Sequence, residues 1–393
     1  MDLPAPALPR PLPSVFAVAL ALLAGCDGTV SIVGRRTPDA TVADDTPDAV
    51  VTADADVPAP DARPPDVTPG MDASVDADVA PPTDVPADAD APAPTPLPRV
   101  IVNCGAVCTR PLDAVLDAMG RTVYFTGFTA ARVPAIFRAA VPAPGAMPVA
   151  PTVLVAGMGL VFPSGLALSN DDATLYVADM AADRGTDDAS LGLGAVFSVA
   201  AVGGTPSIVN LGAALVHPTS VTVSIDGADL LVSAQRLESD GTRSHGVFRA
   251  PRAGSGTPAS MLNLTGPSGI SQSAAGAIVV IDLRRNGPNA GSLVTVAPGG
   301  PVFFAGDLVA SYPAGLAHSV DGRSILVSAA TPAVGPGLLT LVGPDGRSTA
   351  PASLSQGMAA PLGLHRARLV DAWAVADETA GDNGQVFLLN GPL

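Results

Sequence analysis

The feature that most constrains this chain is one phrase that recurs six times. Its fullest copy runs Pro163-Ser-Gly-Leu-Ala-Leu-Ser-Asn-Asp-Asp-Ala-Thr-Leu-Tyr-Val-Ala-Asp179. The copies begin at Pro111, Pro163, Pro218, Pro267, Pro313 and Pro361. A period of roughly 46 to 55 residues is typical of propellers and solenoids, in which each repeat buries its apolar face only against its neighbours.

Each copy has the pattern of a small antiparallel sheet. In the second copy a first strand covers Gly165–Ser169 and a second covers Thr174–Asp179, with the turn Asn170–Asp172 between them. Two other copies have Asp-Gly at this turn, a strong hairpin signal. A third strand follows at Ala195–Val199 and a fourth at Ser207–Asn210. Four strands in each of six repeats predict an all-β fold, a six-bladed β-propeller over residues 99–393.

The two ends of this region complement each other. The sixth copy stops after its third strand, Gln385–Leu389, whereas an unassigned strand, Arg99–Asn103, precedes the first copy. We expect the N-terminal strand to pair as the outer strand of the last blade, because this closes the ring and leaves no open sheet edge.

The N-terminus reads as an export signal over residues 1–26. The apolar run Ser14–Leu23 is too short for a permanent bilayer span, and it ends in Leu23-Ala-Gly-Cys26, which resembles a bacterial lipobox. Cys26 is then the lipidation site, and the membrane is a partner through the lipid anchor. The expected location is the cell envelope: the periplasmic face of the inner or outer membrane, or the cell surface. An ordinary cleaved secretion signal is the alternative.

Residues 27–98 are predicted to be a disordered linker. Within residues 37–98 there are 14 Asp and one basic residue, Arg63, so about −13 of the formal net charge of −16 lies here. Such a segment cannot bury enough apolar surface to offset its ordering entropy. Its prolines and mutually repelling carboxylates favour an extended tether.

Residues 99–393 are nearly neutral, and all 20 basic residues of the chain are arginines. Because no basic stripe is visible, nucleic acid is not an expected partner. Cys104 and Cys108 are separated by only three residues in an exported chain. A turn at Gly105 would bring them within disulfide range, and two free thiols are the alternative.

The phrase Pro-Ser-Gly-Leu…Leu-Tyr-Val-Ala-Asp resembles the blade signature of the NHL and SMP-30/gluconolactonase-like six-bladed propellers. The resemblance implies an axial divalent cation in the enzymes of that group, with two of its ligands in the Pro-x-Gly position. In this chain the position holds Leu112, Ser164, Thr219, Ser268, Ala314 and Leu362. None is the Asn, Asp or Glu that a hard cation prefers. We therefore expect no cofactor, with calcium as the one cation left open.

Three second strands end in a carboxylate, at Asp179, Asp282 and Asp377, and these strands belong to alternate repeats. In a closed ring the three would be about 120° apart on one face. One interpretation is an acidic ring for a cation or a basic ligand. The other is that each Asp ties down its own following loop by side-chain-to-backbone hydrogen bonds.

The loops after the second strands vary most in length and carry much of the charge, as expected of a binding surface on a rigid scaffold. The candidate binding face comprises Asp179, Asp183, Arg184, Arg236, Glu238, Asp282, Arg284, Arg285, Asp377, Glu378 and Asp382. The leading hypothesis is a non-catalytic binding or scaffolding module whose partner is a cell-envelope protein or a glycan. The alternative is a divalent-metal-dependent lactonase, hydrolase or lyase.

Overall fold

The structure, a computed structural model, describes residues 97–393 apart from 185–191, 255, 284–289, 299–301 and 331–335. The predictions for the signal sequence, for Cys26 and for the linker up to residue 96 therefore lie outside the described residues. The same holds for Arg284 and Arg285 of the candidate binding face.

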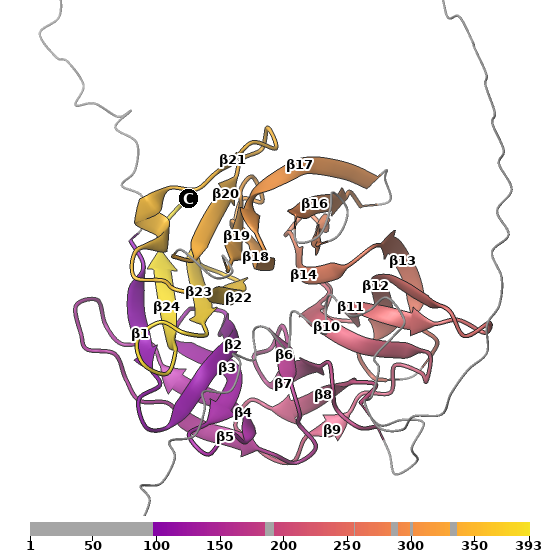
Figure 1. Cartoon of the computed structure of the whole chain (residues 1–393), viewed down its shortest axis with the longest axis horizontal. Coiled ribbons are helices and arrows are strands. Elements are labelled where there is room, and N and C mark those ends of the chain that lie inside the picture. The colour runs from indigo at the N-terminus through magenta and orange to yellow at the C-terminus, as the bar shows by residue number, and fades with distance from the viewer. Residues whose placement is uncertain (1–96, 185–191, 255, 284–289, 299–301, 331–335) are drawn as a thin grey trace, which may run out of the picture. The chain divides into compact units, whose positions relative to one another are not determined.

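Six four-stranded antiparallel sheets surround a common axis (Figure 1). The predicted six-bladed β-propeller is confirmed. Blades 1 and 2 consist of β2 (Cys108–Leu116), β3 (Thr122–Thr129), β4 (Pro134–Ala140) and β5 (Thr152–Ala156), then β6 (Pro163–Leu168), β7 (Thr174–Asp179), β8 (Ala195–Ala200) and β9 (Ser207–Ile208). Blades 3 and 4 consist of β10 (Leu215–Val223), β11 (Asp229–Leu237), β12 (Arg243–Pro251) and β13 (Ala259–Leu264), then β14 (Pro267–Gln272), β15 (Ile278–Asp282), β16 (Ala290–Val296) and β17 (Val302–Ser311). Blades 5 and 6 consist of β18 (Pro313–His318), β19 (Ile325–Ala329), β20 (Leu338–Val342) and β21 (Ser348–Thr349), then the 3-10 helix η2 (Ala352–Ser355), β22 (Pro361–Arg366), β23 (Ala372–Asp377), β24 (Gln385–Asn390) and, from the N-terminal end, β1 (Arg99–Asn103).

The N-terminal strand completes the last blade, as predicted. The order of that sheet is β1-β24-β23-β22, and β1 pairs antiparallel with β24, from Arg99 opposite Leu388 to Asn103 opposite Gln385. Pairing between the two ends of the propeller gives β24 a partner on both sides. No open edge of this blade remains at β24.

The seam between the last and first blades is tied in two further ways. A disulfide joins Cys104 to Cys108, with a Cα–Cα distance of 4.6 Å. The backbone of β1 also bonds to the first blade's own loop, because the N–H of Val149 donates to the carbonyl of Ile101 over 3.0 Å. Both cysteines are buried in the apolar cluster that blades 1 and 6 share.

The core is a ring of apolar clusters that lie between neighbouring blades. One cluster joins blades 5 and 6 around Trp373, which is fully buried. Another joins blades 2 and 3 around Phe248 and Tyr176. Because each sheet buries both of its faces against neighbours, the second strands are almost continuously apolar, as in Ala372–Asp377.

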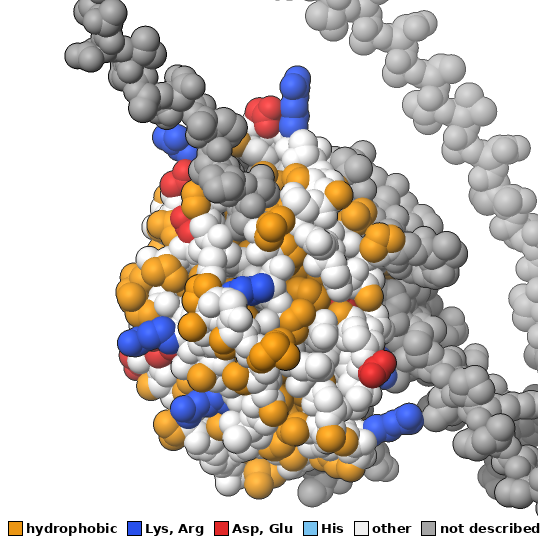
Figure 2. Space-filling model, turned by 90° about the vertical axis from the view of Figure 1, so that its left-hand side faces the viewer, with side chains coloured by type: hydrophobic (Ala, Val, Ile, Leu, Met, Phe, Trp, Pro, Cys, Tyr) orange, Lys and Arg blue, Asp and Glu red, His pale blue; other side chains and the backbone are white. Residues whose placement is uncertain are grey.

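The outer surface shows no concentration of one charge on the side seen in Figure 2, where a few acidic and basic side chains are scattered among small apolar ones. Among the described residues, no helix is long and apolar enough to cross a bilayer.

Candidate functional site

The propeller has two ends, which we name by the sequence found there. At the proline mouth the first strands begin and the second strands end, because Pro163 pairs with Asp179, Pro267 with Asp282 and Pro361 with Asp377. At the opposite hairpin mouth lie the turns that join first to second strands. Each first strand contacts the first strands of both neighbouring blades, so six strands enclose the axis.

The three carboxylates of the proposed acidic ring are fully buried at the proline mouth. Asp179 accepts hydrogen bonds from the backbone N–H groups of Val161 and Phe162, over 2.7 and 2.9 Å. Asp377 accepts bonds in the same way from Ala359 and Ala360. Burial raises the pKa of Asp179, and the N–H donors act in the opposite direction.

Asp282 completes the pattern, since it accepts bonds from the backbone of Thr265 and Gly266. Each aspartate thus holds the two residues that precede the first strand of its own blade. Antiparallel pairing puts the end of the second strand beside the start of the first, so the carboxylate reaches backward along the chain. Asp377 also accepts from Thr379 and Ala380, the following loop.

These contacts correct one part of the sequence interpretation and extend another. Asp179, Asp282 and Asp377 are not part of an exposed binding face, because burial and the N–H donors place them inside the structure. The predicted bonds to the following loop are present at Asp179 and Asp377, and the carboxylates bond in addition to the preceding connection. Within the described residues, no group of three or more His, Cys, Asp or Glu side chains is placed to hold a metal ion.

In blades 1, 3 and 5 the chain enters the first strand without an aspartate to hold the preceding connection. Their second strands have Gly127, Ala234 and Ala329 at the equivalent place. The residues before their prolines adopt left-handed backbone angles instead: φ is 56° at Arg110, 46° at His217 and 56° at Tyr312. The alternation of carboxylates along the sequence therefore marks two ways of leading the chain into a blade.

The other residues of the candidate binding face do not converge. Arg184 donates to backbone carbonyls of Gly194 and Leu215, and burial lowers its pKa. Glu378, also buried, forms an ion pair with Arg110 and is likewise removed from the exposed surface.

Among the described members of the candidate binding face, four remain accessible to solvent. Asp183 accepts from the backbone of Gly192 in its own loop. Arg236 and Glu238 form a half-exposed pair at 3.8 Å, and Asp382 is exposed. That these side chains bind a partner stays a prediction.

The Pro-x-Gly positions do not suit the cation that the family resemblance implies. The hydroxyl of Ser164 donates to the carbonyl of Thr219 over 3.1 Å, and that of Thr219 donates to the carbonyl of Pro267, also over 3.1 Å. Ser268 donates to Ala314 over 3.3 Å. These hydroxyls connect each blade to the next. With apolar residues at the other three positions, the donor set does not fit a divalent cation.

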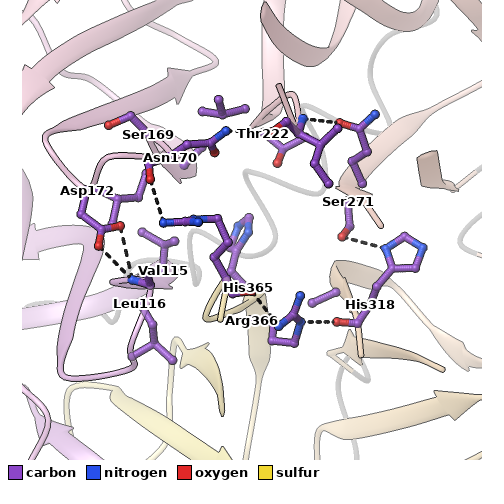
Figure 3. Close-up of a pocket in the computed structure, with 18 of the residues that line it drawn as sticks. Val115, Leu116, Ser169, Asn170, Asp172, Thr222, Ser271, His318, His365 and Arg366 are labelled. Carbon is purple, nitrogen blue, oxygen red and sulfur yellow. Dashed lines mark hydrogen bonds between the residues drawn. The ribbon is translucent and has the colours of Figure 1, made fainter. Parts of the chain in front are cut away.

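The pocket of interest lies at the hairpin mouth, the opposite end from the predicted surface (Figure 3). It has a volume of about 180 Å³, and residues from all six blades line it. They include Val115 and Ala118, Ala167 and Asn170, Thr222 and Ile225, Ser271 and Gln272, Ala317 and His318, and His365, Arg366 and Arg368. We call this cavity the axial pocket.

Two arginines of blade 6 bring positive charge to the axial pocket, and Asp172 of blade 2 adds a carboxylate that accepts from the N–H of Ala118. Arg366 donates from Nε to the carbonyl of His318 over 2.7 Å and from Nη1 to carbonyls of its own hairpin. Arg368 donates from Nη2 to the carbonyl of Asn170 in blade 2 over 2.8 Å. Among the described residues neither forms an ion pair, although the carboxylate of Asp371 acts on Arg366 and partly opposes the lowering of its pKa by burial.

The inner part of the axis contains a histidine bound to a carboxylate. Asp113 is buried, and its carboxylate accepts from the N–H of Leu166 over 2.6 Å and lies 3.1 Å from Nε2 of His365. Burial acts to lower the pKa of His365, but the carboxylate of Asp113 outweighs it and the pKa is raised. Asp113 occupies space that Gly363 leaves, since a Cβ on this glycine would collide with the carboxylate.

A second histidine, His318, lines the axial pocket, and its pKa is lowered where that of His365 is raised. Nδ1 of His318 lies 3.0 Å from the hydroxyl of Ser271. Burial, reinforced by the positive charge of Arg366, lowers the pKa of His318 to about 4. At neutral pH this imidazole is uncharged, so His318 adds no positive charge to the pocket.

We expect His318 to make the protein sensitive to acid. Because its folded pKa of about 4 lies below the usual 6.5, the unfolded state binds more protons between these values, and stability falls as the pH drops through this window. The wild type should lose about 2.5 kcal/mol more than His318→Gln between pH 7 and 4.5. Urea unfolding at the two pH values measures this difference. An equal loss in both proteins would contradict the assignment, and between pH 7 and 8 the gap should stay constant.

The sequence does indicate this pocket, at positions where one copy of the repeat differs from the others. Asp113 stands where four other copies have the Gly of Pro-x-Gly, and His365 and Arg366 stand where the second copy has Ala167 and Leu168. Aligning the six copies position by position exposes these substitutions. The predicted binding face rests on loop length and charge, which carry no information about the residues at the axis.

No protein-family model matches the sequence. The search among curated proteins found no match either. Solved structures match at low identity. A gluconolactonase from Xanthomonas campestris has 14% identity and a TM-score of 0.49, with 77% of this chain and 96% of that chain covered. TolB from Acinetobacter baumannii has 15% identity and a TM-score of 0.45, with 61% and 53% covered, so this chain spans about half of it. A chain of a nidogen–laminin complex has 14% identity and a TM-score of 0.49, with 69% and 94% covered. The strand order of this structure, and not these likenesses, establishes that the protein is a six-bladed β-propeller.

Proposed function

We propose that this protein is a lipid-anchored binding protein of the cell envelope, whose propeller binds a small anionic group, such as a carboxylate, without catalysis. The axial pocket is the binding site. The lipid anchor at Cys26 and the acidic linker would hold the propeller at a distance from the membrane. The binding role inferred from the sequence is thus assigned to the hairpin mouth and not to the proline mouth.

The observation that carries the proposal is the state of Arg366 and Arg368. Arg366 is half-buried, and every hydrogen bond it makes goes to a neutral carbonyl. Its Nη2 group has no partner among the described residues. A guanidinium in a concave, partly desolvated position attracts an anion more strongly than one in open water, since the local dielectric is lower. Planar N–H donors also match a carboxylate.

The rest of the axial pocket suits a small ligand. Thr222 and Ser271 add hydroxyl groups, whereas Val115, Ala167 and Ala317 add apolar wall. Such a mixture of apolar wall and a few polar groups is typical of small-molecule sites. The metal-dependent lactonase alternative has no comparable support, because the Pro-x-Gly hydroxyls are engaged with backbone carbonyls.

The test is calorimetric titration of the full-length protein in detergent with acetate, citrate and phosphate. We expect saturable binding of at least one anion, weakened roughly tenfold by Arg368→Gln, because a charge-assisted contact of about 1.4 kcal/mol is lost. Arg347→Gln is the matched control, since Arg347 is exposed and pairs with Asp345 outside the pocket. EDTA should change nothing. Equal affinity of wild type and Arg368→Gln would refute the proposal.

A further inference from the structure

Exposed apolar side chains stand on four of the six hairpin turns at the end of the propeller that holds the axial pocket. The turns between first and second strands present Met119 in blade 1, Ile225 in blade 3, Val320 in blade 5 and Leu369 in blade 6. Their exposed fractions are 48%, 50%, 39% and 56%. We call these four residues the apolar ring. Single exposed apolar residues need no explanation, but four of them on turns around one charged cavity form a shared surface.

The ring is continuous with the pocket. Ile225 itself lines the cavity, and Met119 and Leu369 directly follow the lining residues Ala118 and Arg368. The turns are also held to one another. The N–H of Leu369 donates to the carbonyl of Ala118 over 2.9 Å, and the N–H of Val320 donates to Asp371 over 3.1 Å. The apolar ring is thus displayed on hairpins that neighbouring blades fix in place.

We propose that the ligand of the axial pocket is the C-terminal end of another polypeptide, with its free carboxylate on Arg366 and Arg368 and its last apolar side chains on the apolar ring. This inference rests on the proposed function, and it names the class of ligand. A carboxylate alone would use the arginines and leave Met119, Ile225, Val320 and Leu369 without a role. An extended chain end supplies one negative charge and apolar side chains next to it.

The charges around the ring limit what else fits. Asp171, Asp226 and Asp321 lie on the same turns and are exposed, and Asp226 and Asp321 form ion pairs with Arg249 at 3.5 Å and Arg323 at 3.9 Å. Hydrogen bonds from Ser169, Ser224 and Ser319, respectively, lower the pKa of each of them, so these carboxylates stay negative. Together with Asp172 in the pocket lining, they disfavour a ligand with many negative charges, such as the chain's own Asp-rich linker or an anionic lipid surface. A peptide with a single terminal carboxylate avoids this repulsion.

The experiment uses fluorescence anisotropy with full-length protein in detergent. The probe is a labelled octapeptide of glycine and serine that ends in three leucines with a free carboxylate. The comparison probe is the same peptide with a C-terminal amide. We expect the amide to bind at least tenfold more weakly than the free acid. Arg368→Gln should lower affinity for the acid roughly tenfold and leave the amide unchanged.

The apolar ring is tested separately. Leu369→Ser and Ile225→Ser should each weaken binding of the acid several-fold, whereas Val202→Ser should not. Val202 is the matched control, because it is 82% exposed on the turn between the third and fourth strands of blade 2, outside the pocket lining. Thermal unfolding of each variant verifies that the fold is intact. Arg366→Gln is examined only if its unfolding temperature matches that of the wild type, since Arg366 also braces its hairpin.

The outcomes are distinct. If citrate or acetate binds with dependence on Arg368 and the three leucines add no affinity, the proposed function stands and the inference fails. If neither small anions nor the peptide binds, both fail. Equal affinity for acid and amide peptides would overturn the inference. Binding to anionic vesicles together with no binding of the peptide would overturn it in favour of a lipid surface.

Discussion

Removal of β1 is expected to prevent the propeller from closing as a stable monomer. A chain that lacks Arg99–Asn103 leaves β24 as an open edge, and it strips the shared cluster of Ile101 and Val102, both fully buried. An unpaired edge strand is a template for association with other chains. We expect oligomers or aggregates in size-exclusion chromatography with light scattering, and loss of the cooperative unfolding transition.

A point substitution gives the same test in a chain of unchanged length. Ile101→Ala should lower the free energy of unfolding by about 3 kcal/mol, because a buried branched side chain is replaced by a cavity. Leu97→Ala is the control: Leu97 is 61% exposed just before β1 and should cost less than about 0.5 kcal/mol. A truncated chain that remains monomeric with wild-type stability would show that β1 does not close the ring in solution.

The second large effect is expected at Asp377, which holds four backbone N–H groups in the structure. Asp377→Ala leaves the N–H groups of Ala359, Ala360, Thr379 and Ala380 without their acceptor. An unsatisfied buried donor costs about 1–3 kcal/mol, and partial access to water reduces the sum. We expect a loss of about 4 kcal/mol in urea unfolding.

Two comparisons make the Asp377 test specific. Asp345→Ala removes an exposed turn aspartate that accepts from Arg347 and should change stability by less than about 0.5 kcal/mol. Asp179→Ala should behave like Asp377→Ala, because it holds the connection into blade 2 in the same way. If Asp377→Ala were as mild as Asp345→Ala, the carboxylate would not be the main support of this connection.

The proline mouth and the hairpin mouth have different chemistry, and this separation bears on function. At the proline mouth, carboxylates, hydroxyls and Arg184 are engaged with backbone groups that connect strands and blades. At the hairpin mouth, Arg366 and Arg368 bond to carbonyls and keep their charge. A binding role is therefore better supported at the end of the propeller that the loop lengths did not indicate.

The repeat alone determined the number of blades, the four strands in each blade and the closing role of β1. These features depend on local signals: alternating apolar residues, turn residues and a period, each of which is visible along the chain. The second strand Thr174–Asp179 has the predicted bounds. The first strand of blade 2 begins two residues earlier than predicted, at Pro163, because Pro163 already pairs with Asp179.

Only the tertiary structure decided what the charged residues do. The sequence pattern suggested an acidic ring of Asp179, Asp282 and Asp377. Their burial and their N–H partners follow instead from the position of each second strand's end, which lies beside the chain that leads into the blade. Arg368 reaches Asn170 over 198 positions of sequence. Such contacts arise from the closure of six inner strands around one axis, a non-local arrangement that no window of sequence contains. The strands could be read from the sequence because their signals are local; the binding pocket could not, because its lining is drawn from all six blades.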